Sequence, residues 1–144
     1  MAVVDWTNLS HALLPTAVRR RAVELRLETD RGVYLPSDPV RVRVLFRNRL
    51  PVPVVFRVES PVPWSWSVDG VDRASRVADP LPADPTRFEF APRERKAFTR
   101  EWHQRIRTGG REWATVDPGE HTLRAWTTDR DRSLTAETTV RVEG

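Results

Sequence analysis

The chain has 144 residues, of which 39% are hydrophobic and 31% charged, and its net charge is +4. This length and composition predict one folded domain with a hydrophobic core rather than a charge-dominated disordered chain. The absence of cysteine excludes a disulfide scaffold, a thiolate metal site and a cysteine nucleophile, and no apolar run reaches the roughly 18 residues of a membrane-spanning helix.

The first 21 residues differ in pattern from the rest of the chain. Trp6, Leu9 and Leu13 follow an i, i+3, i+7 spacing, which places them on one face of a helix. We therefore interpret residues 1–21 as an N-terminal arm or short helix, and residues 22–144 as a separate β-domain.

From residue 22 onward the hydrophobic period is two. Apolar and charged side chains alternate over residues 23–28 and again over 40–47, which predicts two half-buried strands. Between them, residues 32–39 contain the Gly, Pro, Ser and Asp typical of a turn. A third strand is predicted at residues 52–58.

A hairpin follows. Tryptophan and valine alternate with serine over residues 64–68, and Asp69-Gly70 comes directly after them, which is a strong hairpin signal. Residues 75–86 are rich in proline and predict a long loop. The remaining predicted strands are separated by turns or, at residues 107–116, by a second loop: a short one at 88–90, a long one at 96–106, and two more at 121–128 and 134–142.

These segments amount to about eight short strands, with turn signals at regular spacing and no β-α-β units. The pattern predicts an all-β fold, an immunoglobulin-like antiparallel sandwich of about 7–9 strands in two sheets. Four of the six tryptophans lie on predicted strands, and we expect them to pack in the core or on a sheet face rather than to stack on nucleic-acid bases: Trp64, Trp66, Trp102 and Trp126.

Residues 117–125 read D-P-G-E-H-T-L-R-A and resemble the immunoglobulin strand-F pattern D-x-G-x-Y-x-C-x-A. His121 stands at the tyrosine position and Leu123 at the cysteine position. In that pattern the tyrosine hydroxyl bonds back to upstream backbone, and a histidine ring nitrogen can do part of the same work. The missing cysteine fits a reducing, cytoplasmic location.

Residues 40–128 resemble the intracellular proteinase inhibitor (BsuPI-like) family of small immunoglobulin-like domains. The matching segments occur in the family's order and spacing: 40–48, 64–70, 88–94, 98–102 and 117–123. The resemblance implies the sandwich fold and suggests direct inhibition of an intracellular serine protease. The chain departs from the family at residues 73–86, where a Pro- and Ala-rich stretch replaces a Trp- and Phe-containing segment, so an inhibitory surface at that place would not carry over.

The basic residues are nearly all arginine. Lys96 is one of 24 cationic residues, which leaves 23 arginines, and the first 60 residues hold ten arginines against six acidic residues. Alternate positions 41, 43 and 47 would suit a phosphate-binding stripe. We favour the alternative that these arginines face Glu24 and Glu28 on the neighbouring strand, where opposite charges stabilise the pair. Nucleic-acid binding through the basic first 60 residues stays open as a less favoured function.

No pattern of residues points to catalysis. The three histidines, His11, His103 and His121, are too scattered for a metal triad. The chain has no G-x-S-x-G elbow, and the pair Gly109-Gly110 precedes no predicted helix that would make a phosphate loop. We therefore expect no enzyme, and we assign no catalytic residue, cofactor or metal.

The loop at residues 107–116 carries the candidate binding site. Trp113 lies there among Arg107, Arg111 and Glu112, and an aromatic residue surrounded by arginine is typical of protein–protein hot spots. The alternative is that Trp113 folds back over an open end of the sandwich. The sequence thus predicts a non-catalytic, cytoplasmic protein-binding module that contacts its partner through these four residues. The partner's identity and the oligomeric state stay open.

Overall fold

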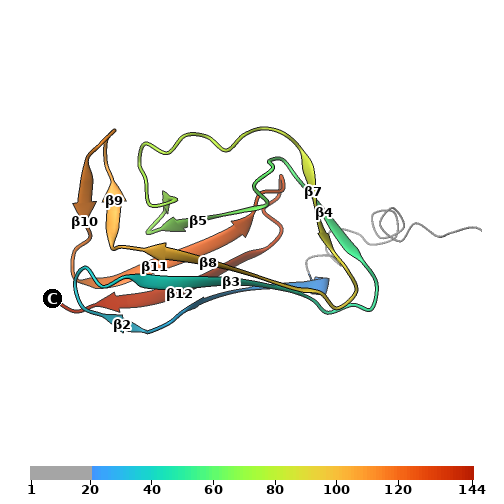
Figure 1. The fold of residues 1–144 in the computed structure, drawn as a ribbon, viewed down its shortest axis with the longest axis horizontal. Helices are drawn as coiled ribbons and strands as arrows, with labels where there is room; N and C mark the ends of the chain where they lie inside the picture. Colours follow the sequence, from blue (N-terminus) through green and yellow to red (C-terminus); the bar gives the residue numbers. More distant parts are fainter. Residues whose placement is uncertain (1–20) are drawn as a thin grey trace, which may run out of the picture.

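A computed structural model describes residues 21–144, and the predicted arm or helix over residues 1–21 lies, apart from Arg21, outside them. The described chain forms twelve strands (Figure 1). They are β1 (Val23–Thr29), β2 (Val33–Tyr34), β3 (Val40–Asn48), β4 (Val54–Val58), β5 (Trp64–Val68), β6 (Val71–Asp72), β7 (Thr86–Phe90), β8 (Arg95–Trp102), β9 (Arg105–Arg107), β10 (Trp113–Thr115), β11 (Gly119–Thr127) and β12 (Thr135–Val142).

Two sheets make up the sandwich. One has the order β1-β3-β8 and the other the order β2-β12-β11-β5-β6, and the core lies between them. Two smaller sheets, β4-β7 and β9-β10, extend from opposite ends (Figure 1). Neighbouring strands are antiparallel except for β2, which runs parallel to β12. The predicted immunoglobulin-like antiparallel sandwich is therefore confirmed.

Charge and hydrophobic alternation explain the pairing of β1 with β3. The inward side chains of β3, such as Val44 and Phe46, are buried, while the arginines between them face solvent. The register places Glu24 opposite Arg47 and Glu28 opposite Arg43, as the sequence predicted.

Aromatic residues fill the core between the sheets. Phe46 meets Phe88 edge-on at 5.1 Å between ring centroids and also contacts Phe98, whose ring packs against Trp64 at 5.5 Å. Trp64, Trp102 and Trp126 are buried and Trp66 is half-buried. The expectation that these four tryptophans pack in the core or on a sheet face is confirmed.

The hairpin and the strand-F corner also form as predicted. Asp69 and Gly70 both have positive φ, 49° and 80°, as a tight two-residue hairpin turn requires, and they join β5 to β6. At the corner, His121 Nε2 lies 2.6 Å from the Asp117 carbonyl oxygen and Nδ1 lies 2.7 Å from Asp69 Oδ2. These two close contacts place the ring between the corner and the hairpin turn, and so link the two.

A buried asparagine, Asn48, bonds the connection between β3 and β4. Asn48 has no exposed surface. Its amide nitrogen donates to the carbonyls of Val52 and Ala91 at 2.9 and 3.0 Å, and its Oδ1 accepts from Leu50 N at 3.0 Å. Its own backbone N–H donates to Glu94 O at 2.8 Å. Asn48 thus links the β3–β4 connection to the β7–β8 turn.

Three predicted segments need correction. The single strand expected at residues 96–106 is two strands, β8 and β9, because Gln104 takes a φ of 60° and turns the chain. The loop expected at residues 107–116 contains β10, which pairs with β9 across a turn at Gly109-Gly110. The predicted turn at 32–39 contains β2, whose partner β12 lies more than 100 residues away in sequence and leaves no local signal.

Candidate interaction site

The β9–β10 hairpin leaves one strand edge open. The backbone of Arg107, on β9, bonds away from β10: its N–H donates to Ala74 O and its carbonyl accepts from Arg76 N, both at 2.9 Å. In the ladder Arg107 faces Trp113. Since residues of an antiparallel pair alternate between bonding inward and outward, the N–H and C=O groups of Trp113 and Thr115 point away from β9. No strand in the described part of the chain pairs with the outer edge of β10, so this edge is available to a further strand.

Trp113 stands on this open edge. Its side chain is 55% exposed, and every residue of β10 is exposed. Beside it lies a pocket of about 510 Å³ whose lining includes Trp66, Trp102, Arg73 and Arg105. The pocket combines apolar ring surface with guanidinium groups, and residue types of this kind are enriched at protein interfaces.

The four residues of the predicted site lie in one hairpin, but they differ in their surroundings. Arg111 and Glu112 are exposed in the turn and Trp113 is exposed on β10. Arg107 is half-buried, and its guanidinium donates to Ser75 Oγ at 3.0 Å and to the Val77 carbonyl at 3.2 Å. Arg107 therefore anchors the loop between β6 and β7 to the hairpin, while the other three residues are exposed.

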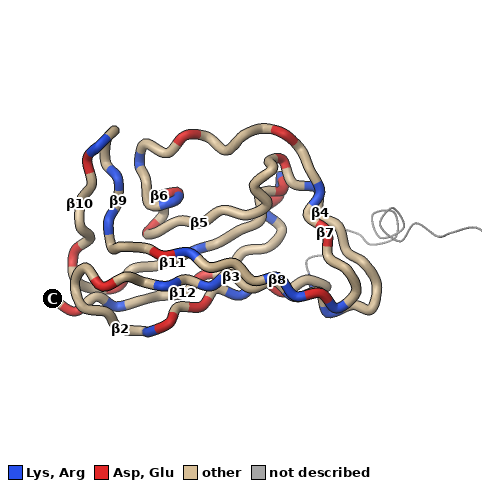
Figure 2. Tube along the Cα trace, in the orientation of Figure 1, with Lys and Arg blue, Asp and Glu red and all other residues tan. Residues whose placement is uncertain are grey.

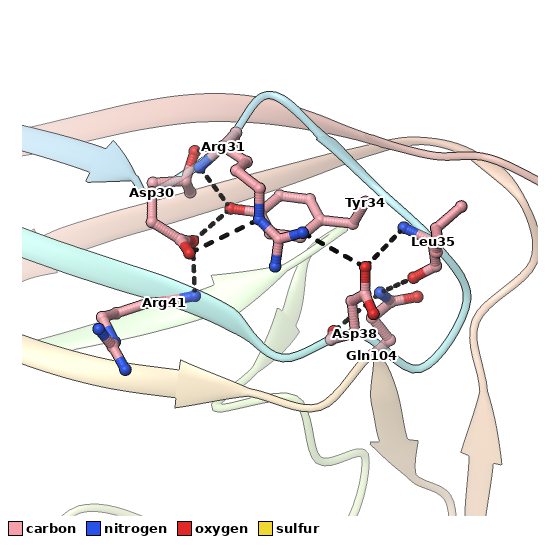
Figure 3. Close-up of polar contacts among 8 residues, drawn as sticks. Asp30, Arg31, Tyr34, Leu35, Asp38, Arg41 and Gln104 are labelled. Carbon is pink, nitrogen blue, oxygen red and sulfur yellow. Dashed lines mark hydrogen bonds and ion pairs between the residues drawn. The ribbon is translucent and has the colours of Figure 1, made fainter.

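Gln104, which the sequence analysis did not single out, holds the hairpin in place (Figure 3). It is fully buried, and its Nε2 donates to the carbonyls of Leu35 and Asp38 at 2.8 and 2.9 Å. Its Oε1 accepts from Ser37 N at 3.3 Å, and its backbone carbonyl accepts from Val116 N at 2.9 Å. A glutamine with all these partners fixes the β8–β9 junction against the β2–β3 turn.

The β2–β3 turn is itself braced by a polar cluster, shown in Figure 3. The Tyr34 hydroxyl donates to Asp30 Oδ1 at 2.6 Å and accepts from Arg31 N at 2.9 Å. Arg31 lies over the Tyr34 ring at 4.7 Å and bonds Asp38 at 3.4 Å. The Tyr34 bond and backbone N–H groups, chiefly that of Arg41, lower the pKa of Asp30, whereas burial and the bond to Asp30 raise the pKa of Tyr34.

The lowered pKa of Asp30 predicts an acid-dependent stability. A carboxyl group with a lowered folded-state pKa stabilises the fold fully above its unfolded pKa of about 3.9, and this stabilisation disappears as pH falls through the folded pKa. Tyr34→Phe removes the main cause of the shift. We expect it to lower the free energy of unfolding by about 1 kcal/mol at pH 7, and by less as pH falls below 4. Urea unfolding at pH 7, 5 and 3 checks this, and a difference that stayed constant over that range would contradict it.

Within residues 21–144, no group of three or more His, Asp or Glu side chains is placed to hold a metal ion. No helix in the same part of the chain is long and apolar enough to cross a membrane.

Comparison with known proteins places the chain in a family. Residues 11–143 match the model of a family of unknown function, DUF7974. The chain belongs to this family. No curated protein matches the DUF7974 chain.

Solved structures share the fold of this DUF7974 chain at low sequence identity. The CARDB domain of the PF1109 protein from Pyrococcus furiosus, determined in complex with di-metal ions, is 12% identical with a TM-score of 0.50, over 84% of this chain and 87% of that one. The β-glucosidase EmGH1 from Erythrobacter marinus is 15% identical with a TM-score of 0.51, over 84% of this chain but 15% of that one. At these identities the likeness shows the fold alone.

Proposed function

We propose that the chain is a non-catalytic protein-binding module that receives an extended segment of its partner on the outer edge of β10. The observation that carries this is the exposed Trp113 on a strand whose outward N–H and C=O groups have no strand of residues 21–144 beside them. A segment added to a sheet edge gains main-chain hydrogen bonds, and a neighbouring pocket selects its side chains. The pocket beside Trp113 supplies that second element.

Replacing Trp113 by alanine tests this proposal. Because the side chain is 55% exposed, we expect the melting temperature to change by no more than about 2 °C. Binding of the partner should weaken by about 2 kcal/mol, as for a hot-spot tryptophan. The tagged full chain would first be used to isolate its partner from the native cytoplasm, and the affinity of the purified partner would then be measured for both chains.

Two further variants sharpen the test. Thr115→Pro removes an outward N–H donor from the same edge and should weaken binding without touching Trp113. Val62→Ala is the control, because Val62 is also exposed, at 40%, but lies beside Thr128 beyond the far end of β11. A large fall in melting temperature for Trp113→Ala would show that Trp113 packs as part of the core, which would refute the assignment. Unchanged partner affinity in Trp113→Ala would equally refute the assignment.

The resemblance to intracellular proteinase inhibitors supports a narrower form of this proposal, in which the partner is an intracellular serine protease and the module acts in the cytoplasm. The segment that departs from that family is exposed over most of residues 76–85 and is held by Arg73, which bonds the Asp79 carbonyl, and by Arg107. Because an inhibitory surface does not carry over to this departing segment, the narrower proposal rests on the resemblance of the sandwich strands and not on residues 73–86. Titrating a subtilisin-like intracellular protease with the full chain, with no loss of activity, would count against this form for that enzyme.

Nucleic-acid binding ranks below protein binding. One observation favours it: arginines of β1 and β3 from the basic first 60 residues share the outer face of one sheet. A nucleic-acid ligand would bind with an affinity that falls steeply with salt. A gel-shift experiment at low salt with no detectable complex would dispose of this function.

A further inference from the structure

Arginines surround a half-buried leucine on the outer face of the β1-β3-β8 sheet. Leu45 lies at the centre of β3, with Arg26 of β1 on one side and Ala97 of β8 on the other. Arg43 and Arg47 lie two residues before and after Leu45 on the same face. With neighbouring side chains they line a hollow of about 490 Å³ whose floor includes Leu45 and Ala97. Figure 2 shows the basic positions recurring along β3 and at the start of β8.

Two of the cations that line this hollow face each other. Arg47 is the direct cross-strand partner of Arg95 on β8, and like charges in that arrangement destabilise a sheet. Glu24, on the other side of Arg47, makes its ion pairs with Arg26 at 3.0 Å and with Arg49 at 2.5 Å. Within the described chain, neither Arg47 nor Arg95 makes an ion pair, and Glu24, which faces Arg47 across the strands, is shared among three arginines. An anionic ligand between Arg47 and Arg95 would relieve their repulsion.

We propose that this hollow binds an acidic peptide segment with the pattern acid–x–aliphatic–x–acid. Side chains two residues apart in an extended peptide lie on the same face at about 7 Å spacing. An extended segment lying along β3 therefore places its aliphatic side chain over Leu45 and its two carboxylates over Arg43 and Arg47. The planar guanidinium fork binds carboxylates through paired hydrogen bonds. Arg95, which faces Arg47 across the strands, adds a second positive charge for the carboxylate that lies over Arg47.

The same face is poorly suited to nucleic acid. Single-stranded nucleic acids bind to basic surfaces that also carry aromatic side chains for base stacking. The outward positions of β1, β3 and β8 hold charged, aliphatic and threonine side chains and no aromatic one: Glu24, Arg26, Glu28, Arg41, Arg43, Leu45, Arg47, Arg95, Ala97, Thr99 and Glu101. An aliphatic floor flanked by cations fits a peptide that alternates carboxylates with an aliphatic residue.

The proposal is tested with the full chain and a labelled peptide carrying two Glu-Ser-Leu-Ser-Glu repeats. We expect NMR shift changes confined to the outward positions of β1, β3 and β8, and an affinity that falls as salt rises. The register control has the same composition in the order Ser-Glu-Leu-Glu-Ser, which turns the carboxylates away from the leucine face. Equal binding of the two peptides, or tighter binding of an oligo(dT) strand than of the first peptide, would overturn the proposal.

Arg95→Gln separates ligand binding from folding. We expect it to weaken peptide binding about tenfold, the loss of one charge-assisted contact, while the melting temperature stays the same or rises because the like-charge pair is relieved. The matched control is Arg57→Gln, an exposed arginine on β4 in a different sheet, which should leave the affinity unchanged. A lowered melting temperature for Arg95→Gln, or equal weakening by Arg57→Gln, would contradict the site. This face is distinct from the β10 edge, so Trp113→Ala should leave the peptide affinity unaltered.

Discussion

Replacing Gln104 by alanine is expected to lower the free energy of unfolding by about 2–4 kcal/mol, because it removes three side-chain hydrogen bonds and leaves a small cavity. The carbonyls of Leu35 and Asp38 lose the Gln104 amide donors, and Ser37 N loses its acceptor. The effect should concentrate at the β9–β10 hairpin, because Gln104 turns the chain between β8 and β9 with its φ of 60°. Amide hydrogen exchange in β9 and β10 should therefore accelerate more than in β11.

Chemical unfolding and hydrogen exchange measure both effects. His103→Ala is the control, since His103 precedes Gln104 but is exposed, and it should change stability by less than about 0.5 kcal/mol. Gln104→Glu keeps the shape but replaces the amide donors with a carboxylate that faces two carbonyls, so it should destabilise at least as much as alanine at neutral pH. A Gln104→Ala protein with unchanged stability and exchange would show that the hairpin holds its position without this residue.

The parts of the fold that the sequence predicted correctly are those fixed by local patterns. The period-two alternation of β3 determines which side chains are buried, and the Asp69-Gly70 pair sets a turn that needs positive φ. The D-x-G-x-H corner was predictable because the contact that closes it joins residues close in sequence. The His121 ring contacts the carbonyl of Asp117, four residues earlier. Each of these signals lies within about ten residues of the structure that it predicts.

The parts that the sequence did not predict depend on distant partners. β2 has two residues and forms only because β12 lies beside it. Gln104 looks like an ordinary polar residue of a strand, and its role appears only when the turn at residues 35–38 packs against it. For the same reason, composition singled out Trp113 as a contact residue but gave no sign of the pocket that Trp66 and Trp102 form beside it.

A sandwich without cysteine must hold its sheets together by other means. Leu123, at the cysteine position of the immunoglobulin strand-F pattern, is buried in the core with 1% of its surface exposed. Burial of apolar side chains supplies most of the stability. Buried polar residues with several polar contacts each hold the connections in position: His121 at the corner, Gln104 at the β8–β9 junction and Asn48 at the β3–β4 junction. Such networks are costly to break, because each unpaired buried group loses its hydration without compensation.

Asn48→Ala should therefore be among the most destabilising single changes in the described chain. It removes two donors and one acceptor at a site with no exposed surface. It also leaves the Val52 and Ala91 carbonyls without these amide donors where water has little access. We expect the free energy of unfolding to fall by about 3 kcal/mol and the melting temperature by about 10 °C. Urea unfolding and thermal melting of the full chain measure this.

Asn48→Asp distinguishes the hydrogen-bond explanation from a simple loss of volume. Aspartate has nearly the same shape and can still accept from Leu50 N, but it has no N–H to give to Val52 or Ala91. If hydrogen bonding is what Asn48 contributes, the buried carboxylate beside two carbonyls should destabilise the fold at pH 7 at least as much as alanine does. If cavity formation were the main cost, Asn48→Asp would be close to wild type. The order of the two variants therefore decides whether donors or packing hold the β3–β4 junction.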